Sequence, residues 1–369
     1  MRKAPVLRFK GFTNDWEQHT LGDFGSVAMN KRIFKNQTTD KGDVPFFKIS
    51  TFGKKADSFI SNNLFEKYKE KYPYPQKGDL LISASGSIGR IVEYKGQKAY
   101  YQDSNIVWLN HNKELLNIYL KAYYQIIHWH GIEGSTIKRL YNKNILATSI
   151  FVPDKKEQYE LGKLIKKAEK IISLQQRRLE SFQFTYHEII RRLFLKKAKW
   201  QQTKLSDLVT ILDKNRKPVK KEDRLFGDTP YYGANGIQDY ISGFTHKGEF
   251  ILIAEDGANN LTEYPIYFVK GQIWVNNHAH VLKVNKDVSP LFLTLALKQI
   301  NYSKYTVGSS RNKLNLKDLE NIAIFIPDNN EQQKIGQFYS NYLNYLRINK
   351  KRIQYMKQFK QFLLQNMFI

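Results

Sequence analysis

The chain has 369 residues, of which 41% are hydrophobic and 14% aromatic, and it carries a formal net charge of +25 and no cysteine. This length predicts two or three domains, the composition excludes a disordered chain, and the absence of cysteine excludes disulfides, thiolate zinc sites and cysteine nucleophiles. So large a basic excess points first to a polyanion partner such as nucleic acid, although an AT-rich coding sequence would also raise the lysine content.

The opening residues MRKAPVLRFKGFTNDW carry charges but lack the apolar core of a signal peptide. No run in the chain approaches the roughly 18 apolar residues of a membrane span. We therefore expect a cytoplasmic protein without a membrane partner.

Most of the chain consists of two copies of an internal sequence repeat. WEQHTLGD (16–23) returns as WQQTKLSD (200–207), VPFFKIS (44–50) has a counterpart in TPYYGAN (229–235), and KGDLLIS (77–83) has one in KGEFILI (247–253). The passage GSTIKRLYNKNILATSIFVPDKKEQ (134–158) recurs as GSSRNKLNLKDLENIAIFIPDNNEQQ (308–333). Two long repeats indicate a duplicated domain, and the second copy is about ten residues shorter in its variable middle.

Each copy predicts a mixed α/β (α+β) globular domain followed by a long helix. Short β-branched and aromatic runs separated by Gly, Asn and Asp favour strands in the front part. After Asp154 and Asp328, apolar residues recur every three or four positions, which predicts coiled-coil-like helices about 60 Å long. These two aspartates are predicted N-caps, with Glu157 and Glu331 completing capping boxes. The predicted divisions are a domain at 1–153, a helical spacer at 154–199, a second domain at 200–327 and a final helix at 328–369.

Gln175 and Asn349 are the polar interruptions of the two helical seams, and they are again 174 residues apart. A polar residue at a core position can set the register of a coiled coil. If the helices pair antiparallel, these two residues could meet. The alternative is that both face solvent at a local irregularity.

A search for catalytic motifs finds little. The chain has no P-loop and none of the adjacent prolines of an amino-methyltransferase site. The histidines of HWH (128–130) and NHAH (277–280) have no acidic partner at metal spacing, so no metal site is predicted. Asp79 followed by Glu93 and Lys95 imitates a metal-dependent nuclease site, but Asp79 could equally begin a strand after a turn.

The remaining candidates are polar loop residues suited to reading DNA. Arginine can read guanine, asparagine and glutamine can read adenine, and lysine mostly binds phosphate. An ordinary polar loop is the alternative for each residue taken alone. The candidate DNA contacts are Ser85, Ser87, Arg90, Gln102, Asn105, Lys138, Arg139, Asn235, Asn259, Asn260, Asn276, Asn277, His278, Arg311 and Lys313.

Across nearly its whole length the chain resembles the specificity subunits of Type I restriction–modification enzymes. The similarity lies in PVLRFKGFTNDWEQHTLGD, in the twice-used passage that ends in IFVPD or IFIPD followed by EQ, and in the helix ends RRLF and LLQNMF. TPYYGANGIQDYISG, EDGANN and YPIYFVKGQIWVNNHAHVL are similar to a recurrent target-recognition type, whereas residues 31–110 are not recognised.

The resemblance implies two target recognition domains, each reading one half of a bipartite double-stranded DNA site. It also implies an antiparallel coiled coil that sets their spacing and docks two modification subunits, with restriction subunits as further partners. Catalysis would belong to those partners, which would use S-adenosylmethionine, ATP and Mg²⁺, and this chain would need no cofactor. Two alternatives stay open: an endonuclease using Asp79, Glu93 and Lys95, and a basic coiled-coil adaptor without sequence preference.

Overall fold

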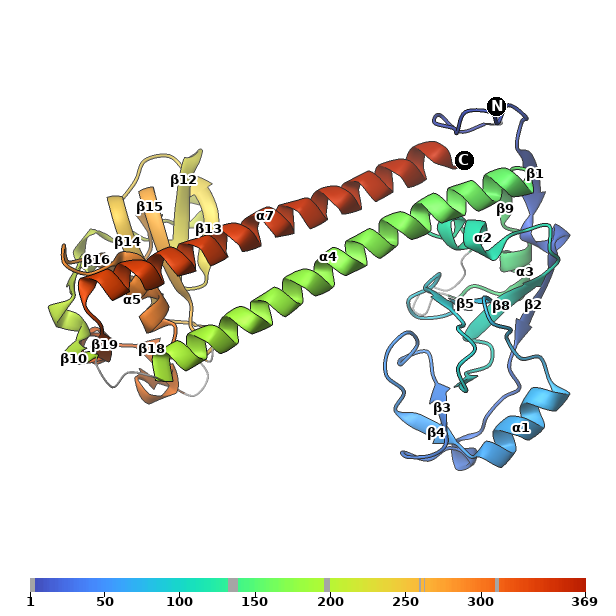
Figure 1. The fold of residues 1–369 in the computed structure, drawn as a ribbon, viewed down its shortest axis with the longest axis horizontal. Coiled ribbons are helices and arrows are strands. Elements are labelled where there is room, and N and C mark those ends of the chain that lie inside the picture. Colours follow the sequence, from blue (N-terminus) through green and yellow to red (C-terminus); the bar gives the residue numbers. More distant parts are fainter. Residues whose placement is uncertain (1–3, 132–138, 196–199, 259, 262, 309–311) are drawn as a thin grey trace. The chain divides into compact units, whose positions relative to one another are not determined.

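The computed structural model describes residues 4–131, 139–195, 200–258, 260–261, 263–308 and 312–369. The chain forms two compact units, and each contains parts of both long helices, α4 (Lys155–Leu195) and α7 (Asn329–Met367) (Figure 1). The first unit comprises Met1–Gln176 and Arg352–Ile369, and the second comprises Arg177–Lys351. Among the described residues, no helix is both long and apolar enough to cross a membrane.

In its described residues, the first unit contains three small sheets and three short α-helices. Its four-stranded sheet has the order β2 (Gly25–Met29), β8 (Ile106–His111), β5 (Leu80–Ser83), β6 (Ile91–Glu93). Its three-stranded sheet has the order β4 (Ser58–Ile60), β3 (Val44–Phe47), β7 (Tyr100–Tyr101), and β1 (Glu17–Thr20) pairs with β9 (Ser149–Val152). The short helices are α1 (Asn62–Lys71), α2 (Asn117–Tyr123) and α3 (Asn142–Leu146).

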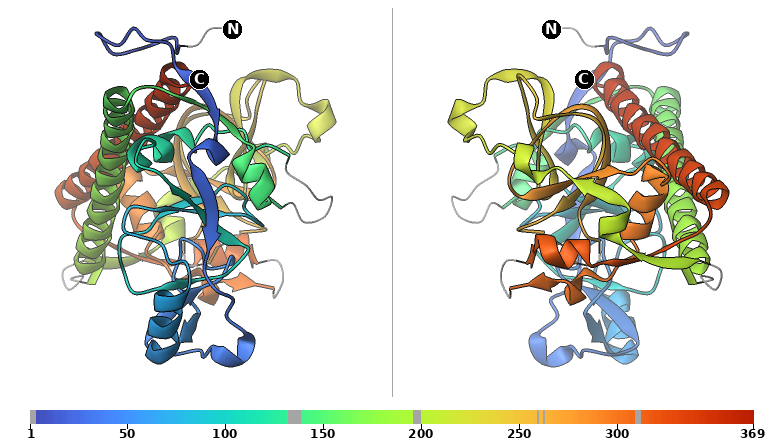
Figure 2. Two further views of the ribbon diagram at one scale, coloured as in Figure 1. Left: turned by 90° about the vertical axis from the view of Figure 1, so that its right-hand side faces the viewer. Right: turned by 90° about the vertical axis from the view of Figure 1, so that its left-hand side faces the viewer.

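The second unit has one larger sheet (Figure 2). Its strand order is β11 (Val209–Ile211), β16 (Ala279–Val284), β14 (His246–Ala254), β15 (Ile266–Val275), β12 (Phe226–Gly233), β13 (Gly236–Ile241). The smaller pairs are β10 (Gln201–Lys204) with β19 (Ala323–Ile326), and β17 (Thr306–Val307) with β18 (Lys313–Leu314). The short helices include α5 (Pro290–Leu297) and α6 (Leu316–Glu320), and the 3-10 helix η4 (Asp213–Asn215) follows β11.

The two units share one topology, which confirms the duplication. The long strand β15 stands where the first unit has β6 and β7, so both units follow the same strand order. β3 and β12 each pair parallel with the later strand, as expected if VPFFKIS and TPYYGAN are counterparts. Strand pairing makes Ile60 equivalent to Ile241 and Ser83 equivalent to Ala254. The difference in residue number between the two units falls by ten between these two positions. The ten-residue helix α1 lies in that interval and accounts for the shorter second copy.

Within each unit the two long helices run antiparallel, as predicted. In the second unit the end of α4 packs on the start of α7, where the rings of Tyr186 and Tyr342 stack with centroids 3.4 Å apart. Phe182 contacts Tyr345 at a centroid distance of 4.1 Å, whereas Phe184 is 72% exposed, so Phe182 occupies the seam. In the first unit the start of α4 and the end of α7 share one hydrophobic core.

The predicted register residues fall in different units. Gln175 belongs to the first unit and Asn349 to the second, and both are partly buried. The side-chain amide of Asn349 donates to the carbonyl of Tyr345 on its own helix at 2.8 Å. A meeting of Gln175 with Asn349 stays a prediction.

The recurring Asp-x-x-Glu-Gln sequence attaches each long helix to its domain. Asp154 and Asp328 accept the N–H groups of Glu157 and Glu331 at 3.0 and 2.9 Å, which confirms both N-caps. The predicted capping box is wrong at Glu157. Its buried carboxylate instead accepts from both the Arg8 guanidinium and the Trp16 indole, because it faces the domain core and not solvent.

The glutamine of this sequence is a buried link between two helices. Gln158 donates to the Pro153 carbonyl at 3.0 Å and accepts the Leu116 N–H at 2.9 Å, just before α2. Gln332 repeats both bonds with the Pro327 carbonyl and the Ser289 N–H, each at 3.0 Å. A buried amide side chain is stabilised by such hydrogen bonds. These bonds explain, from structure alone, why glutamine stands at this position in both copies of the repeat.

Gly162 and Gly336 occupy the same point of the two long helices, where a short helix approaches closely. A Cβ on Gly162 would lie 2.5 Å from the Ile118 carbonyl oxygen in α2. On Gly336 it would lie 2.8 Å from Oγ of Ser289, the N-cap of α5. Glycine in a helix interior costs about 1 kcal/mol relative to alanine, so close packing explains its presence here.

We predict that Gly162→Ala lowers the free energy of unfolding by about 1–3 kcal/mol, because overlap with the Ile118 carbonyl outweighs the gain in helix propensity. Urea unfolding of the full chain measures the change. Lys167→Ala on the exposed side of α4 is the control and should change stability by less than about 0.5 kcal/mol. A Gly162→Ala variant as stable as the unmodified chain would contradict the close approach.

Candidate DNA interface

Four segments of the second unit meet at one edge of its sheet. The side-chain amide of Asn235, in the β12–β13 turn, donates to the Gly257 carbonyl at 2.9 Å. After β14, the Glu255 N–H donates to the His278 carbonyl at 2.9 Å, and the Glu255 carbonyl accepts the Leu314 N–H at 2.7 Å. The structure therefore brings together these predicted contacts: Asn235, Asn276, Asn277, His278 and Lys313.

The β15–β16 turn shapes this edge. Asn276 is buried, and its side-chain oxygen accepts the His278 N–H at 2.8 Å, so Asn276 holds the turn and does not face solvent. Asn277 is exposed at the tip. Nδ1 of His278 is buried without a hydrogen-bond partner in the described part of the chain and lies 3.7 Å from an Asp256 carboxylate oxygen. Asn277 and His278 are therefore better placed than Asn276 to meet a ligand.

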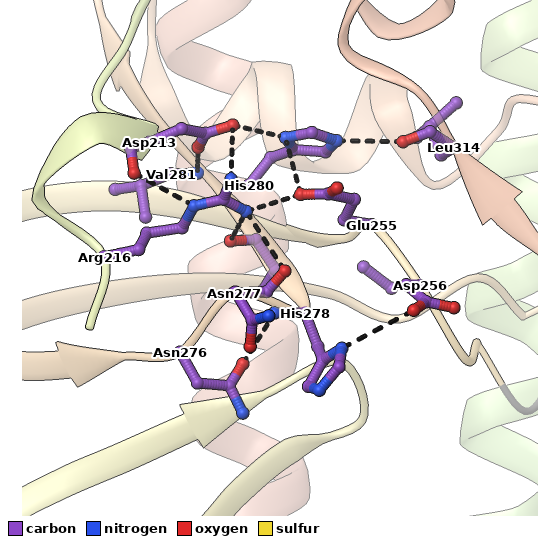
Figure 3. A network of polar contacts seen from close by, with 12 residues as sticks. Asp213, Arg216, Glu255, Asp256, Asn276, Asn277, His278, His280, Val281 and Leu314 are labelled. Atoms are coloured by element: carbon purple, nitrogen blue, oxygen red, sulfur yellow. Dashed lines mark hydrogen bonds and ion pairs between the residues drawn. The ribbon is translucent and has the colours of Figure 1, made fainter. Parts of the chain in front are cut away.

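A charged network lies behind this edge and ties its loops together (Figure 3). The Arg216 guanidinium lies 2.6 Å from a Glu255 carboxylate oxygen and 3.4 Å from an Asp213 carboxylate oxygen. Nδ1 of His280 lies 2.5 Å from the same Asp213 oxygen, and Nε2 of His280 donates to the Leu314 carbonyl at 2.9 Å. The network connects η4, the end of β14, the start of β16 and β18.

The environment of Asp213 favours its ionised form. Burial raises the pKa of Asp213, but hydrogen bonds from His280 and the Val281 N–H, with the charges of His280 and Arg216, outweigh burial. The pKa of Asp213 therefore lies below its usual value. A carboxylate that is paired in this way contributes stability only while it remains ionised.

The same side chains form the kind of cluster that could hold a metal ion, but their partners argue against one. Ligand atoms of Asp213, Glu255 and His280 lie within 4.8 Å of one another. Arg216 already contacts both carboxylates and supplies the positive charge that an ion would bring. Both ring nitrogens of His280 are already engaged, one with the Asp213 carboxylate and the other with the Leu314 carbonyl. The residues present fit an arginine-centred network and not a metal site.

Sequence reasoning did not find this network. The NHAH segment has no acidic residue near it in the sequence at metal spacing, but His280 pairs with Asp213, 67 positions away along the chain. No local spacing could reveal that pairing. The long-range contact exists because η4 follows β11, and β11 pairs with β16, the strand that carries His280.

The first unit repeats the backbone arrangement with different side chains. The Ala84 N–H donates to the Asn105 carbonyl at 2.8 Å, and the Leu140 N–H donates to the Ala84 carbonyl at 2.9 Å. Oγ of Ser85 donates to the Asn105 side chain at 2.7 Å, and Ser85 pairs with Arg139 in an isolated bridge. The predicted contacts Ser85, Asn105 and Arg139 therefore lie together, although Ser85 is itself buried.

A pocket of about 530 Å³ in the first unit stands where the second unit has its charged network. Strand register places the pocket-lining Met29 and Ala84 at the positions of Asp213 and Glu255. Arg139 also lines the pocket and is exposed. The two edges therefore share a backbone and differ in charge and shape.

The other predicted contacts are engaged inside loops or lie outside the described residues. Gln102 accepts the Ile49 N–H at 2.9 Å, Arg90 donates to the Phe52 carbonyl at 2.9 Å, Asn260 accepts the Glu263 N–H at 3.0 Å, and the Ser87 carbonyl accepts the Ser83 hydroxyl. Lys138, Asn259 and Arg311 fall outside the described part of the chain.

The nuclease alternative gains no support from the side chains it needs. Asp79 accepts the Gln76 N–H at 2.7 Å in the turn before β5, as its structural role predicts. Glu93 lies 2.7 Å from the Lys121 ammonium, whose hydrogen bond holds the pKa of Glu93 below its usual value. The backbone N–H of Lys95 donates to a neighbouring glutamine in a turn. Two carboxylates with these partners do not form a magnesium site.

Comparison with known proteins agrees with this geometry. A family model of the type I restriction modification DNA specificity domain matches the chain twice, at residues 13–182 and 197–358. A putative type I restriction enzyme specificity subunit of Haemophilus influenzae is 55% identical over 150 residues, which are 40% of this chain and 39% of that protein. The EcoprrI specificity subunit of Escherichia coli is 29% identical over 100 residues, 27% of this chain and 24% of that protein. The chain thus matches less than half the length of these relatives.

Solved structures show the same fold. The S subunit of a type I restriction–modification system from M. genitalium has a TM-score of 0.68 at 17% identity, over 99% of both chains. A chain from a structure on complex assembly and conformational transition of the type I R-M system has a TM-score of 0.54 at 14% identity, over 96% of this chain and 98% of that one.

The lowered pKa of Asp213 predicts how the stability of the folded chain changes with pH. Because its folded pKa is lowered, the stability it contributes is present above the unfolded pKa of about 4 and is lost as pH falls through the folded pKa. Asp213→Asn should therefore be clearly less stable than the unmodified chain at pH 7, and the difference should shrink below about pH 4. Urea unfolding followed by tryptophan fluorescence across this range measures it. A difference that stays constant with pH would contradict the ionised network.

Proposed function

Because this chain belongs to the type I restriction modification DNA specificity family, we propose that it is the sequence-reading, non-catalytic subunit of a type I restriction–modification complex. Each unit reads one half of a bipartite, asymmetric site in double-stranded DNA. The two alternatives, an endonuclease and an adaptor without sequence preference, have no comparable support.

The observation that carries this proposal is a repeated backbone edge with different side chains. Asn105 of the first unit stands at the position of His278 in the second, and Arg139 at the position of Lys313. Side chains at such positions distinguish base edges, whereas a shared backbone keeps both readers at a similar depth on the duplex. One frame with two sets of contacts suits an asymmetric site with two different halves.

Charge and helix length add support. A net charge of +25 provides the sequence-independent attraction to phosphates on which specific reading is built. The 41 residues of α4 correspond to about 60 Å of helix, enough to separate two readers by one to two duplex turns. In this role the long helices set the gap between the half-sites.

The long helices also have surface for partner subunits. Apolar residues at least 40% exposed occur along both helices: Ile171, Leu174, Phe184 and Ile189 on α4, and Ile348, Tyr355, Phe359 and Phe362 on α7. Repeated exposed apolar side chains on a helix mark an interaction site. We assign them to two modification subunits, which would supply S-adenosylmethionine-dependent adenine methylation. Restriction subunits would supply the ATP- and Mg²⁺-dependent cleavage.

The experiment that tests the function is adenine methylation mapping. We expect that co-expression of this chain with its modification subunit, in a host without adenine methylation, produces methylation at one bipartite motif with a fixed gap. Single-molecule sequencing of the host genome reads the motif directly. The control is the modification subunit alone, which should leave the genome unmethylated. Methylation without a motif, or none at all, would refute the two-reader role.

A second prediction concerns docking. Phe359→Glu combined with Phe362→Glu should weaken binding of a modification subunit at least tenfold, because two exposed rings on α7 become charged. Co-purification and calorimetric titration with the modification subunit measure the loss. Phe226→Glu makes the same chemical change at a side chain of β12 that is 92% exposed, and it should bind normally. Equal binding by all three proteins would exclude this face of α7.

A further inference from the structure

Each unit contains an arginine at the same position that reaches the turn preceding β8 or β16. Gly25 in β2 pairs with the last residue of β8, and Val209 in β11 pairs with the last residue of β16, so Gly25 and Val209 are equivalent. Arg32 and Arg216 each lie seven residues after these positions, just beyond β2 and β11. The sequences around them, KRI and NRK, share only the arginine, so the repeat does not reveal the correspondence. The strand register does.

In the second unit, Arg216 binds the tip of the turn and the first residue of β16. Its guanidinium donates to the Asn277 carbonyl at 3.5 Å and to the Ala279 carbonyl at 3.0 Å, while Glu255 and Asp213 fix it from the other side (Figure 3). The side chain is 15% exposed. A guanidinium held by two carboxylates has one orientation, and it transmits that orientation to the turn.

In the first unit, Arg32 binds the turn through one side chain. Its Nε donates to the Asp103 carboxylate at 2.8 Å, and Asp103 is 14% exposed. The next residue, Ser104, has a φ of 59°, which among the described non-glycine residues is the one positive value. A side-chain-bearing residue keeps that conformation only where its surroundings enforce it. The Arg32–Asp103 pair is placed to do so.

We propose that Arg32 and Arg216 are positioning residues, which fix the geometry of the two reading turns and thereby set the sequence discrimination of one half-site each. The inference rests on the proposed DNA-reading function and adds residues outside the predicted contact set. Base-edge contacts need accurate placement of their donors and acceptors, whereas phosphate contacts tolerate displacement. Loss of either arginine therefore relaxes base choice before it weakens overall DNA binding.

The test maps adenine methylation in cells that carry the full complex with Arg32→Ala or Arg216→Ala. We expect each variant to accept additional bases in one half-site, a different half for each variant, with the other half and the gap unchanged. The slope of DNA affinity against salt concentration should stay the same, because neither arginine contacts phosphate in this role. Arg224→Ala is the matched control. It removes a partly buried arginine of the same unit that pairs with Asp239 at 3.2 Å and lies over the Tyr231 ring, and it should keep the motif intact.

A charge swap separates positioning from simple structural damage. Arg32→Asp alone and Asp103→Arg alone should relax the same half-site, and the double variant should restore its discrimination. Arg32 is 60% exposed, so these variants test the proposal even if Arg216→Ala does not fold. For Arg216, Arg216→Lys should retain part of the discrimination.

Three outcomes would overturn the inference. They are an unchanged motif in Arg32→Ala, a relaxation spread over both half-sites, and a salt slope reduced by about one unit, which would indicate a direct phosphate contact. Failure of the proposed function is recognised separately, because the unmodified complex would then give no bipartite motif.

Discussion

Two backbone hydrogen bonds form the constraint on which both reading edges depend. The first residue after β5 is Ala84, and the first residue after β14 is Glu255. In each unit the N–H of this residue donates to the carbonyl of the residue just before β8 or β16, and its carbonyl accepts the N–H of Leu140 or Leu314. These bonds use only main-chain groups, so they specify no side chain. The frame can therefore stay constant while everything attached to it changes. The first unit uses this freedom for a pocket and the second for an arginine-centred network.

What the sequence could predict follows from the range of each interaction. The repeat, the long helices and their N-caps depend on local spacing and periodicity, and the structure confirms them. The antiparallel pairing of the helices is implied by the family resemblance, and contacts such as that of Tyr186 with Tyr342 agree with it. The capping box at Glu157 failed because an arginine 149 positions away along the chain binds its carboxylate, which is turned toward the domain core. Several of the predicted DNA contacts lie close together, and whether they touch DNA stays a prediction. Loops after strands converge at one edge, but which polar residue faces outward depends on contacts far along the chain, as Asn276 and Gln102 show.

The two units attach their long helices through the same contacts but place different side chains at the sheet edge, and this difference shows which contacts the duplication has preserved. Gly162 and Gly336 keep the short helices close, and Gln158 and Gln332 fasten them, in both copies. Asp213 and Glu255 have no charged counterpart in Met29 and Ala84. The contacts that attach each long helix to its domain are thus the same in both units, whereas the side chains behind the sheet edge differ.

The glutamine joint has a consequence for inheritance. Gln158 binds the carbonyls of Pro153 and Glu114 and the Leu116 N–H, and Gln332 binds the Pro327 carbonyl and the Ser289 N–H. All of these partners are main-chain groups within the same unit, so the glutamine joint does not depend on the side chains of the domain that precedes it. A genetic crossover in the short stretch that encodes the joint would therefore fuse a different front domain to the same helix with these main-chain bonds intact. New combinations of two existing half-proteins could then arise in a single recombination event, with no intermediate that has to be refined by point mutation.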